Sequence, residues 1–338
     1  MTSRERVRRA LRFERPDRVA RDLWVLDGAM VHHKAAVEAL RERFPGDIAH
    51  PPIHQPRLAH QVGHPTEVGT YVDEWGCRFE NIQRGVVGEV KEPLVGEWSE
   101  LGKVKAPMEL VGVGLEEVDG FCESTETFVL AGWGTPFERM QYIRGSENLY
   151  MDIADPPAEF FELRRMVHEF NLAGQEALCR TKIDGIIFAD DWGSQKALLI
   201  SPARWRELYK PLYRDYAAMA KAAGKFVFMH SDGYIMDIYE DLIEIGVDAI
   251  NSQLFCMPIE EIGKRFAGRI TFWGEIDRQN LMPRGTVGQV REGVRRVWRN
   301  LAREGGGVIA QFEYGIDTRP ENAVAAFEEW EQAGCGAG

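Results

Sequence analysis

Residues 202–233 read PARWRELYKPLYRDYAAMAKAAGKFVFMHSDG. Ser201 directly precedes Pro202, the first residue of the run, and a glycine stands at position 224, so the sequence predicts a helix over Pro202–Ala223. The apolar run Lys225–Met229 follows as a predicted strand. A helix that leads through a glycine into a short buried strand is the unit of a parallel sheet covered by helices.

The same alternation extends in both directions along the chain. Eight strands are predicted, at Val19–Trp24, Asp47–His50, Phe128–Ala131, Gly185–Asp190, Lys225–Met229, Val247–Asn251, Arg269–Trp273 and Gly307–Gln311. The helices predicted to cover them are Ala29–Phe44, Pro157–Lys182, Pro202–Ala223, Ile235–Ile245, Pro258–Phe266, Val287–Glu304 and Glu321–Gln332. Eight strand-helix units favour the α/β class and a single (β/α)8 TIM barrel.

One region interrupts the alternation. Between Pro51 and Val118 the helical spacing disappears, and alternating stretches such as Val86–Val90 lie among glycines and prolines. This composition indicates a β-rich insertion within the barrel. Because no linker rich in Pro, Gly or Ser separates two halves, residues 1–338 are predicted to form one domain.

Composition excludes several classes of protein. The 338 residues contain 41 Lys plus Arg and 53 Asp plus Glu, a net charge of −12, which argues against a nucleic-acid partner. No run approaches the roughly 20 apolar residues of a membrane span, and the first residues do not form the apolar core of a signal peptide. Five cysteines without CxxC spacing fit a reducing compartment. We expect a cytoplasmic protein with no membrane partner.

Polar side chains follow nearly every predicted strand. The carboxyl ends of barrel strands meet at one face, where active sites are assembled from different loops. We therefore predict that this face binds a small-molecule substrate. The predicted substrate-binding residues are Asp22, Trp24, Trp133, Trp192, Gln195, Asn251, Gln253, Asp277 and Gln311.

The segment Met229–Gly233 suggests a metal site. His230 and Asp232 leave an apolar strand two residues apart, so their side chains can point to the same side. With Glu313 they supply one imidazole and two carboxylates, which suit a divalent cation. Gln311 and Cys256 are alternative third ligands. In the competing interpretation, Asp232 caps the following helix and His230 is a buried structural histidine.

Three acids are candidates for catalysis. Asp190 and Asp191 are adjacent at a strand end and can act as a general base, although the sequence does not decide which one faces the pocket. Glu275 and Asp277 are each a possible acid or ligand, and Asp277 can equally cap the next segment or pair with Arg278. Four histidines with partial HxxxH spacing lie in the proline-rich loop after the second predicted strand: His50, His54, His60 and His64. The two alternatives for this loop are metal binding and a polar surface lid.

Five motifs resemble the uroporphyrinogen decarboxylase superfamily over nearly the whole chain. They are Arg15-Pro16-Asp17-Arg18-Val19, Asp73-Glu74-Trp75-Gly76, Asp191-Trp192-Gly193-Ser194-Gln195, His230-Ser231-Asp232-Gly233 and Gly274-Glu275-Ile276-Asp277-Arg278-Gln279. The resemblance implies a (β/α)8 barrel, a homodimer and one of two chemistries. These are cofactor-free decarboxylation of tetrapyrrole acetates and zinc-dependent methyl transfer with a separate corrinoid protein.

Departures from both branches refine this expectation. The decarboxylases carry an Arg-Gln-Ala-Gly-Arg stretch where this chain reads Trp24-Val25-Leu26-Asp27-Gly28-Ala29, so cations for substrate carboxylates are missing. The methyltransferases carry His-x-Cys and a later Cys where this chain has His230-x-Asp232 and Glu313. Two carboxylates make the site harder, so manganese, magnesium and iron compete with zinc.

The leading hypothesis is a metal-dependent methyltransferase or demethylase that uses a corrinoid (cobalamin) bound to a partner protein. A divalent metal, with zinc as the first choice, would act as the Lewis acid. The alternatives are a metal-free decarboxylase that uses Asp190 or Asp191, and a non-catalytic barrel that binds a small ligand.

Overall fold

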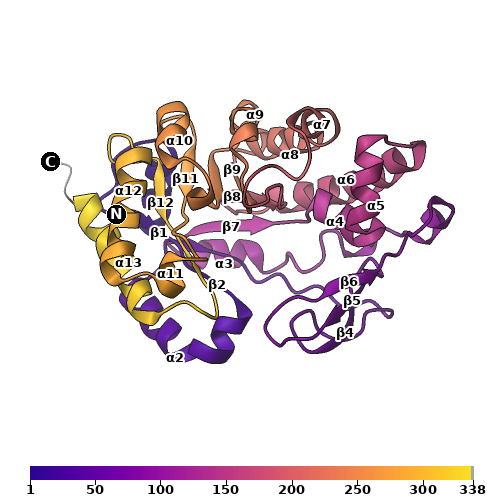
Figure 1. Cartoon of the computed structure of the whole chain (residues 1–338), viewed down its shortest axis with the longest axis horizontal. Helices are drawn as coiled ribbons and strands as arrows, with labels where there is room; N and C mark the ends of the chain where they lie inside the picture. The colour runs from indigo at the N-terminus through magenta and orange to yellow at the C-terminus, as the bar shows by residue number, and fades with distance from the viewer. Residues whose placement is uncertain (336–338) are drawn as a thin grey trace.

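A computed structural model describes residues 1–335 and confirms the predicted (β/α)8 barrel. Its strands are all parallel and follow the order β1-β12-β11-β10-β9-β8-β7-β3 (Figure 1). They are β1 (Ala20–Arg21), β3 (Ile48–Ala49), β7 (Phe128–Gly132), β8 (Gly185–Ala189), β9 (Phe226–Ser231), β10 (Ala249–Ser252), β11 (Thr271–Trp273) and β12 (Val308–Ala310). Asp47 N donates to Arg21 O (2.7 Å), which nearly closes the ring between β1 and β3.

Helices surround the strands (Figure 1). They are α1 (Ser3–Leu11), α2 (Asp27–Arg43), α3 (Val118–Ser124), α4 (Pro136–Arg144), α5 (Ser146–Ala154), α6 (Ala158–Cys179), α7 (Pro202–Leu208), α8 (Lys210–Ala222), α9 (Tyr239–Glu244), α10 (Ile259–Phe266), α11 (Leu281–Arg284), α12 (Val287–Leu301) and α13 (Pro320–Cys335). Helix α12 shows why they form, because Thr286 and Gln289 make a capping box and Val290, Val294 and Val297 are fully buried.

Two predicted helices are each divided. The run 202–223 forms α7 and α8, because Pro211 has no N–H to donate within a continuous helix and instead stands in the first turn of α8. The run 235–245 forms a 3-10 turn, Met236–Ile238, followed by α9. The prediction of single helices over these two runs is wrong.

The first and last barrel strands are also interrupted. After β1 the chain forms β2 (Trp24–Val25), and after β12 it forms β13 (Glu313–Tyr314). Strands β2 and β13 pair with each other in parallel, outside the barrel sheet. The fully buried Asp22 carboxylate occupies the break, where it accepts hydrogen bonds from Leu23 N (3.0 Å) and from the indoles of Trp24 (2.9 Å) and Trp273 (3.0 Å). The predicted continuous strand Val19–Trp24 is therefore two short ones.

An antiparallel three-stranded sheet lies within the predicted insertion. It consists of β4 (Gly69–Val72), β5 (Arg78–Asn81) and β6 (Glu89–Glu92), and 3-10 turns follow at Trp98–Lys103 and Met108–Leu110. The insertion reaches the start of α2, where Gly28 N donates to Gly85 O (3.1 Å). The backbones approach so closely that a Cβ on Gly85 would lie 2.6 Å from Gly28 Cα. This contact places the insertion against the start of α2, and Figure 1 shows its strands below α4 and α5.

Arginines of the N-terminal segment close the opposite end of the barrel. Asp47 is fully buried and accepts from Arg6 (2.6 Å), Arg18 (2.7 Å) and Arg21 N (2.8 Å). Asp184 binds Arg4 (2.9 Å) in the same way. No described helix combines the length and apolarity needed to cross a membrane. Four described cysteines are free thiols, while the side chain of Cys335 and residues 336–338 lie outside the described part.

Candidate metal and substrate site

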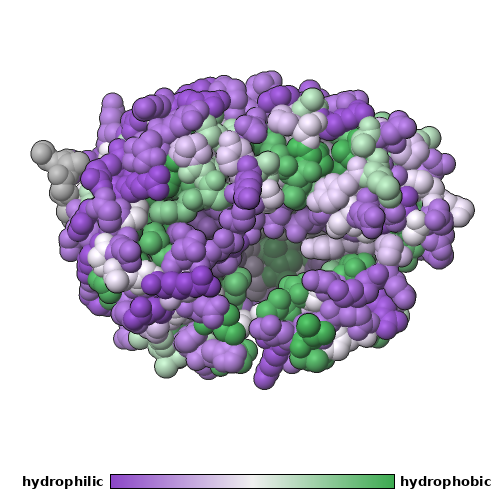
Figure 2. Space-filling view, in the orientation of Figure 1, coloured by the Kyte–Doolittle hydropathy of each residue, from purple (hydrophilic) through white to green (hydrophobic). Residues whose placement is uncertain are grey.

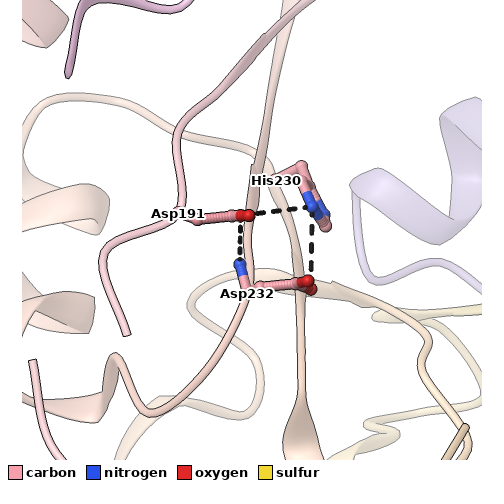
Figure 3. Close-up of side chains that lie close together, drawn as sticks. All are labelled: Asp191, His230 and Asp232. Atoms are coloured by element: carbon pink, nitrogen blue, oxygen red, sulfur yellow. Dashed lines mark hydrogen bonds and ion pairs between the residues drawn. The ribbon is translucent and has the colours of Figure 1, made fainter. Parts of the chain in front are cut away.

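Three side chains converge at the carboxyl ends of β8 and β9 (Figure 3). His230 Nε2 lies 3.6 Å from Asp191 Oδ1 and 3.7 Å from Asp232 Oδ1. Asp191 also accepts a hydrogen bond from Asp232 N (2.8 Å). Each residue offers one ligand atom, and these atoms all lie within 4.8 Å of one another. One imidazole and two carboxylates at this spacing form a donor set for a divalent cation.

Asn251 determines which imidazole nitrogen faces the acids. The Asn251 amide nitrogen donates to Trp273 O (2.6 Å) and to Gln311 Oε1 (3.0 Å). Because a backbone carbonyl only accepts, the amide oxygen is the atom that faces His230 Nδ1, at 2.7 Å. His230 therefore carries its hydrogen on Nδ1 and directs the Nε2 lone pair toward Asp191 and Asp232. This is the tautomer that a metal-binding histidine requires.

The two oxygens of Asp232 have different surroundings. Oδ2 accepts a hydrogen bond from Arg278, whereas Oδ1 is buried and has no hydrogen-bond partner among the described residues. A buried carboxylate oxygen without a partner is costly, and it faces His230 Nε2. A divalent cation would satisfy both atoms. The residues present therefore fit a metal ion.

Glu313 lies beside this group but outside it. The predicted ligand set was His230, Asp232 and Glu313, whereas the structure brings Asp191 into the third place. Arg278 binds Glu313 Oε1 (2.7 Å) while it also binds Asp232. Glu313 thus shares a guanidinium with a ligand, and burial raises its pKa above the ordinary value.

Asp190 and Asp191 point in opposite directions. Asp190 is fully buried and accepts from Phe137 N (3.0 Å), Glu138 N (2.8 Å) and the Tyr213 hydroxyl, so it caps the start of α4. Burial raises the pKa of Asp190 to about 7. Of the two predicted catalytic acids, Asp191 is the one that faces the His230 group.

Two further acids surround the group. Glu275 is nearly fully buried, which raises its pKa well above 4.5 while Arg278 opposes the shift. Burial, followed by the charges of Asp190 and Asp191, raises the pKa of Glu138 to about 8. Both acids therefore hold protons more tightly than free carboxyl groups do. Such groups are suited to proton transfer near neutral pH.

The remaining predicted residues take several positions. The Trp24 ring lies 4.9 Å from the His230 ring, and Gln311 binds Asn251. Gln195 donates to Gln253 (2.9 Å) in a narrow cleft that Glu275 and Asp277 also line. Asp277 caps the turn before α11 through the amides of Gln279 and Asn280, which is the structural role considered for it. Trp133 lines a separate cavity.

Trp192 does not face the mouth. It is fully buried, stacks on Phe137 with ring centroids 4.0 Å apart and donates to the Tyr213 hydroxyl (2.9 Å). Its prediction as a substrate-binding residue is not supported by this position. The indole instead packs α4 against α8.

The histidine-rich loop and Cys256 supply no ligand to the group. His50 Nδ1 is bound to Leu130 O (2.9 Å) and His60 to Glu74 O (3.1 Å). None of the four loop histidines belongs to the metal-sized group found among residues 1–335. Cys256 lies 3.0 Å from Gln253 O, and burial raises its pKa to about 11, so it is a neutral thiol.

A large cavity opens beside the group. It has a volume of about 800 Å³ and is lined by the polar or charged residues Asp22, Trp24, Arg41, His50 and Glu313 together with apolar residues of β2 and of the turn after α2. In Figure 2 the surface is hollowed near the centre of the view, and hydrophobic residues lie at the bottom of this hollow. This volume falls within the range of small-molecule sites.

Sequence reasoning missed Arg278 and Glu138 as members of the site. Arg278 was considered only as a partner of its neighbour Asp277, but it binds Asp232 and Glu313 instead. Glu138 lies in the first turn of α4, directly after the third barrel strand, and that position at the mouth was an available signal.

A family model described as uroporphyrinogen decarboxylase (URO-D) matches residues 62–332. The chain belongs to this family. Among solved structures, the fold of this chain is similar to that of a methyltransferase from Methanosarcina mazei, with a TM-score of 0.65. The two sequences are 16% identical, and the match covers 98% of this chain and 99% of that chain. A GH113 β-1,4-mannanase gives a TM-score of 0.42 and 13% identity over 94% and 99% of the two chains. No curated protein sequence matches the chain.

Proposed function

We propose that this URO-D family member is a metal-dependent methyltransferase or demethylase that works with a separate corrinoid protein. The observation that carries the proposal is the buried Asp232 Oδ1, which has no hydrogen-bond partner within residues 1–335 and faces His230 Nε2 beside Asp191. Similarity to a methyltransferase fold over nearly the whole chain supports the same choice. The chain contains no DxHxxG corrinoid signature, so the proposal assigns the corrinoid to a partner.

Each residue has a role in this proposal. His230 Nε2, Asp191 and Asp232 would hold a divalent metal, with zinc as the first choice and harder metals as competitors. When bound, the metal supplies a Lewis acid that lowers the pKa of a thiol, phenol or alcohol. Arg278 binds Asp232 and orients its carboxylate. Glu138, with its pKa raised to about 8, can accept the proton that such a hydroxyl or thiol releases only at a pH near or above 8.

The metal content of purified protein tests the first half of the proposal. We expect near-stoichiometric divalent metal by elemental mass spectrometry in the wild type and at least tenfold less in Asp232→Ala and His230→Ala. Asp155→Ala is the matched control, because it removes an exposed carboxylate that is not part of the metal-sized group, and it should retain the metal. A wild type without metal would reject the proposal.

Methyl transfer tests the second half. We expect the wild type to demethylate free methylcobalamin in the presence of thiols or phenols, followed by the absorbance of the corrinoid. His230→Ala should lose this activity while it keeps the folded circular dichroism spectrum. Release of carbon dioxide from a small acid by metal-free protein would instead identify a decarboxylase.

A further inference from the structure

A second cavity lies at the mouth, between the end of β7, helix α6 and the insertion. Its volume is about 300 Å³, and its main lining residues are Glu74, Trp75, Trp133, Arg139, Phe170 and Asn171. They come from three separate segments of the chain. The size lies at the lower end of the range for small-molecule sites, which suits a single substituted ring.

Aromatic rings form the walls of this cavity. The Phe170 ring lies 5.1 Å from Trp75 in an edge-on arrangement and 5.6 Å from Trp133 in a tilted one. Trp75 and Trp133 are 4% and 8% exposed, so each offers only a small area to the cavity. Walls of this kind recognise a flat ring through offset and edge-to-face contacts.

The turn Asp73-Glu74-Trp75-Gly76, a family-like motif without an assigned role, fixes one wall. Asp73 Oδ1 accepts from Trp75 N (3.0 Å) and Cys77 N (2.8 Å), and Gly76 adopts a positive φ of 86°. The carboxylates of Asp73 and Glu74 also bind Arg139 of α4. The motif thereby holds the Trp75 indole against α6.

The charged groups of the cavity are held in ion pairs. Arg139 is ion-paired with both Asp73 and Glu74, and its guanidinium lies 5.5 Å from the Trp75 ring centroid. One guanidinium faces two carboxylates, so an anionic ligand would meet an excess of negative charge and would have to compete with these ion pairs. The cavity therefore disfavours an anionic ligand.

Asn171 offers an unused donor. It is 2% exposed, and among the described residues its Nδ2 makes no hydrogen bond of full geometry, although it lies close enough to the Tyr216 hydroxyl to lower the pKa of that group. The side chain is packed against Gly134, where a Cβ would come within 1.8 Å of Asn171 Oδ1. A buried donor without a partner is satisfied by an acceptor oxygen on a ligand.

We propose that this cavity binds a small, uncharged aromatic molecule with an oxygen substituent, either a phenol or an aryl ether. The inference deepens the proposed function and rests on it for the reaction, because the ligand would be the organic substrate. Helix α4 connects the two places, since Arg139 lines the cavity while Asp190, beside Asp191, caps the same helix. Ring binding itself uses none of the three metal-binding residues.

Isothermal titration calorimetry with 4-methoxyphenol and cyclohexanol tests the proposal. We expect wild-type protein to bind 4-methoxyphenol at millimolar concentration or below and cyclohexanol at least fivefold more weakly. Phe170→Leu keeps an apolar side chain but removes one wall, so its affinity for 4-methoxyphenol should fall at least fivefold. Ile53→Trp fills the partly exposed edge of the cavity and should abolish binding.

Two controls separate this inference from the metal proposal. Met108→Trp adds an indole to an exposed site of the same insertion and should bind like the wild type. His230→Ala should also bind the ring within twofold of wild type, so loss of metal and loss of ring binding are distinguishable. The inference is overturned if wild type fails to bind 4-methoxyphenol, if cyclohexanol binds equally well, or if Ile53→Trp still binds.

Discussion

Asn251 sets the state of His230 before any metal binds. Its amide can only be oriented one way, because its nitrogen faces the Trp273 carbonyl. We predict that Asn251→Ala weakens metal affinity roughly 10- to 100-fold, since Nδ1 loses its acceptor and the imidazole its fixed orientation. Competition with a chromophoric chelator measures the affinity. Asn251→Asp, which retains an acceptor for Nδ1, should bind metal more tightly than the alanine variant, and the reverse order would contradict this role.

Glu138 gives the metal-free protein a pH-dependent stability. Burial raises the pKa of its carboxyl from 4.5 to about 8, so between these values the folded state holds a proton that the unfolded state has released. The free energy of unfolding should therefore fall as pH rises through this window. Glu138→Gln removes the titrating group, and its urea unfolding should show a smaller slope with pH. An unchanged slope would mean that Glu138 titrates normally.

For individual residues, the sequence predicted part of the candidate site. His230 lies on β9 and Asp232 directly follows the strand, and the two side chains share a side because the strand's alternation with period two continues by one residue. Asp190 and Asp191 could not be distinguished, because they lie where β8 ends and the alternation ends with it. The ion pairs that Arg278 forms with both Asp232 and Glu313 could not be predicted either, since they join residues far apart in the chain.

Helix α4 depends on a residue of another element. Asp190, at the end of β8, supplies the acceptor for its first amides. We predict that Asp190→Ala lowers the free energy of unfolding by roughly 2–4 kcal/mol, because two buried amides and the Tyr213 hydroxyl lose their partner. Urea denaturation measures the change. Asp191→Ala removes an adjacent carboxylate that accepts one backbone hydrogen bond, and it should cost less than about 1.5 kcal/mol. Equal losses would argue against the cap.

Most elements could be predicted, because hydrophobic periodicity and glycine stops are local signals. The breaks in them could not. The division of the first strand depends on Asp22 receiving hydrogen bonds from the Trp24 and Trp273 indoles, and Trp273 is remote in sequence. The division at Pro211 was readable in principle, but a proline in the first turn of a second helix resembles one inside a single helix.

The ion pairs and hydrogen bonds of Asp47 stabilise the amino-terminal end of the whole barrel. We predict that Asp47→Ala lowers the free energy of unfolding by roughly 3–5 kcal/mol, because it leaves the buried Arg6 guanidinium short of a partner and removes the acceptor for Arg21 N. Asp17→Ala is the control, since it also binds Arg6 but is 43% exposed, and should cost about 1 kcal/mol or less. Denaturant unfolding curves distinguish the two. Similar costs would show that closure does not depend on Asp47.

The fold could be predicted at this scale because polar residues follow the strands while the strands themselves are apolar. The Asp191, His230 and Asp232 group could be placed at the mouth for the same reason. The aromatic cavity could not, because its walls come from the insertion, β7 and α6, whose relative placement no local pattern encodes.

The pairing of β1 with β12 has a consequence for how the protein is made. Ala20 and Arg21 leave the ribosome long before their partners Ile309 and Ala310, because most of the barrel lies between them in the chain. During translation this edge of β1 stays unpaired until β12 has emerged, and such edges invite association with other chains. The first strand is therefore exposed to wrong partners throughout the synthesis of the strands between them.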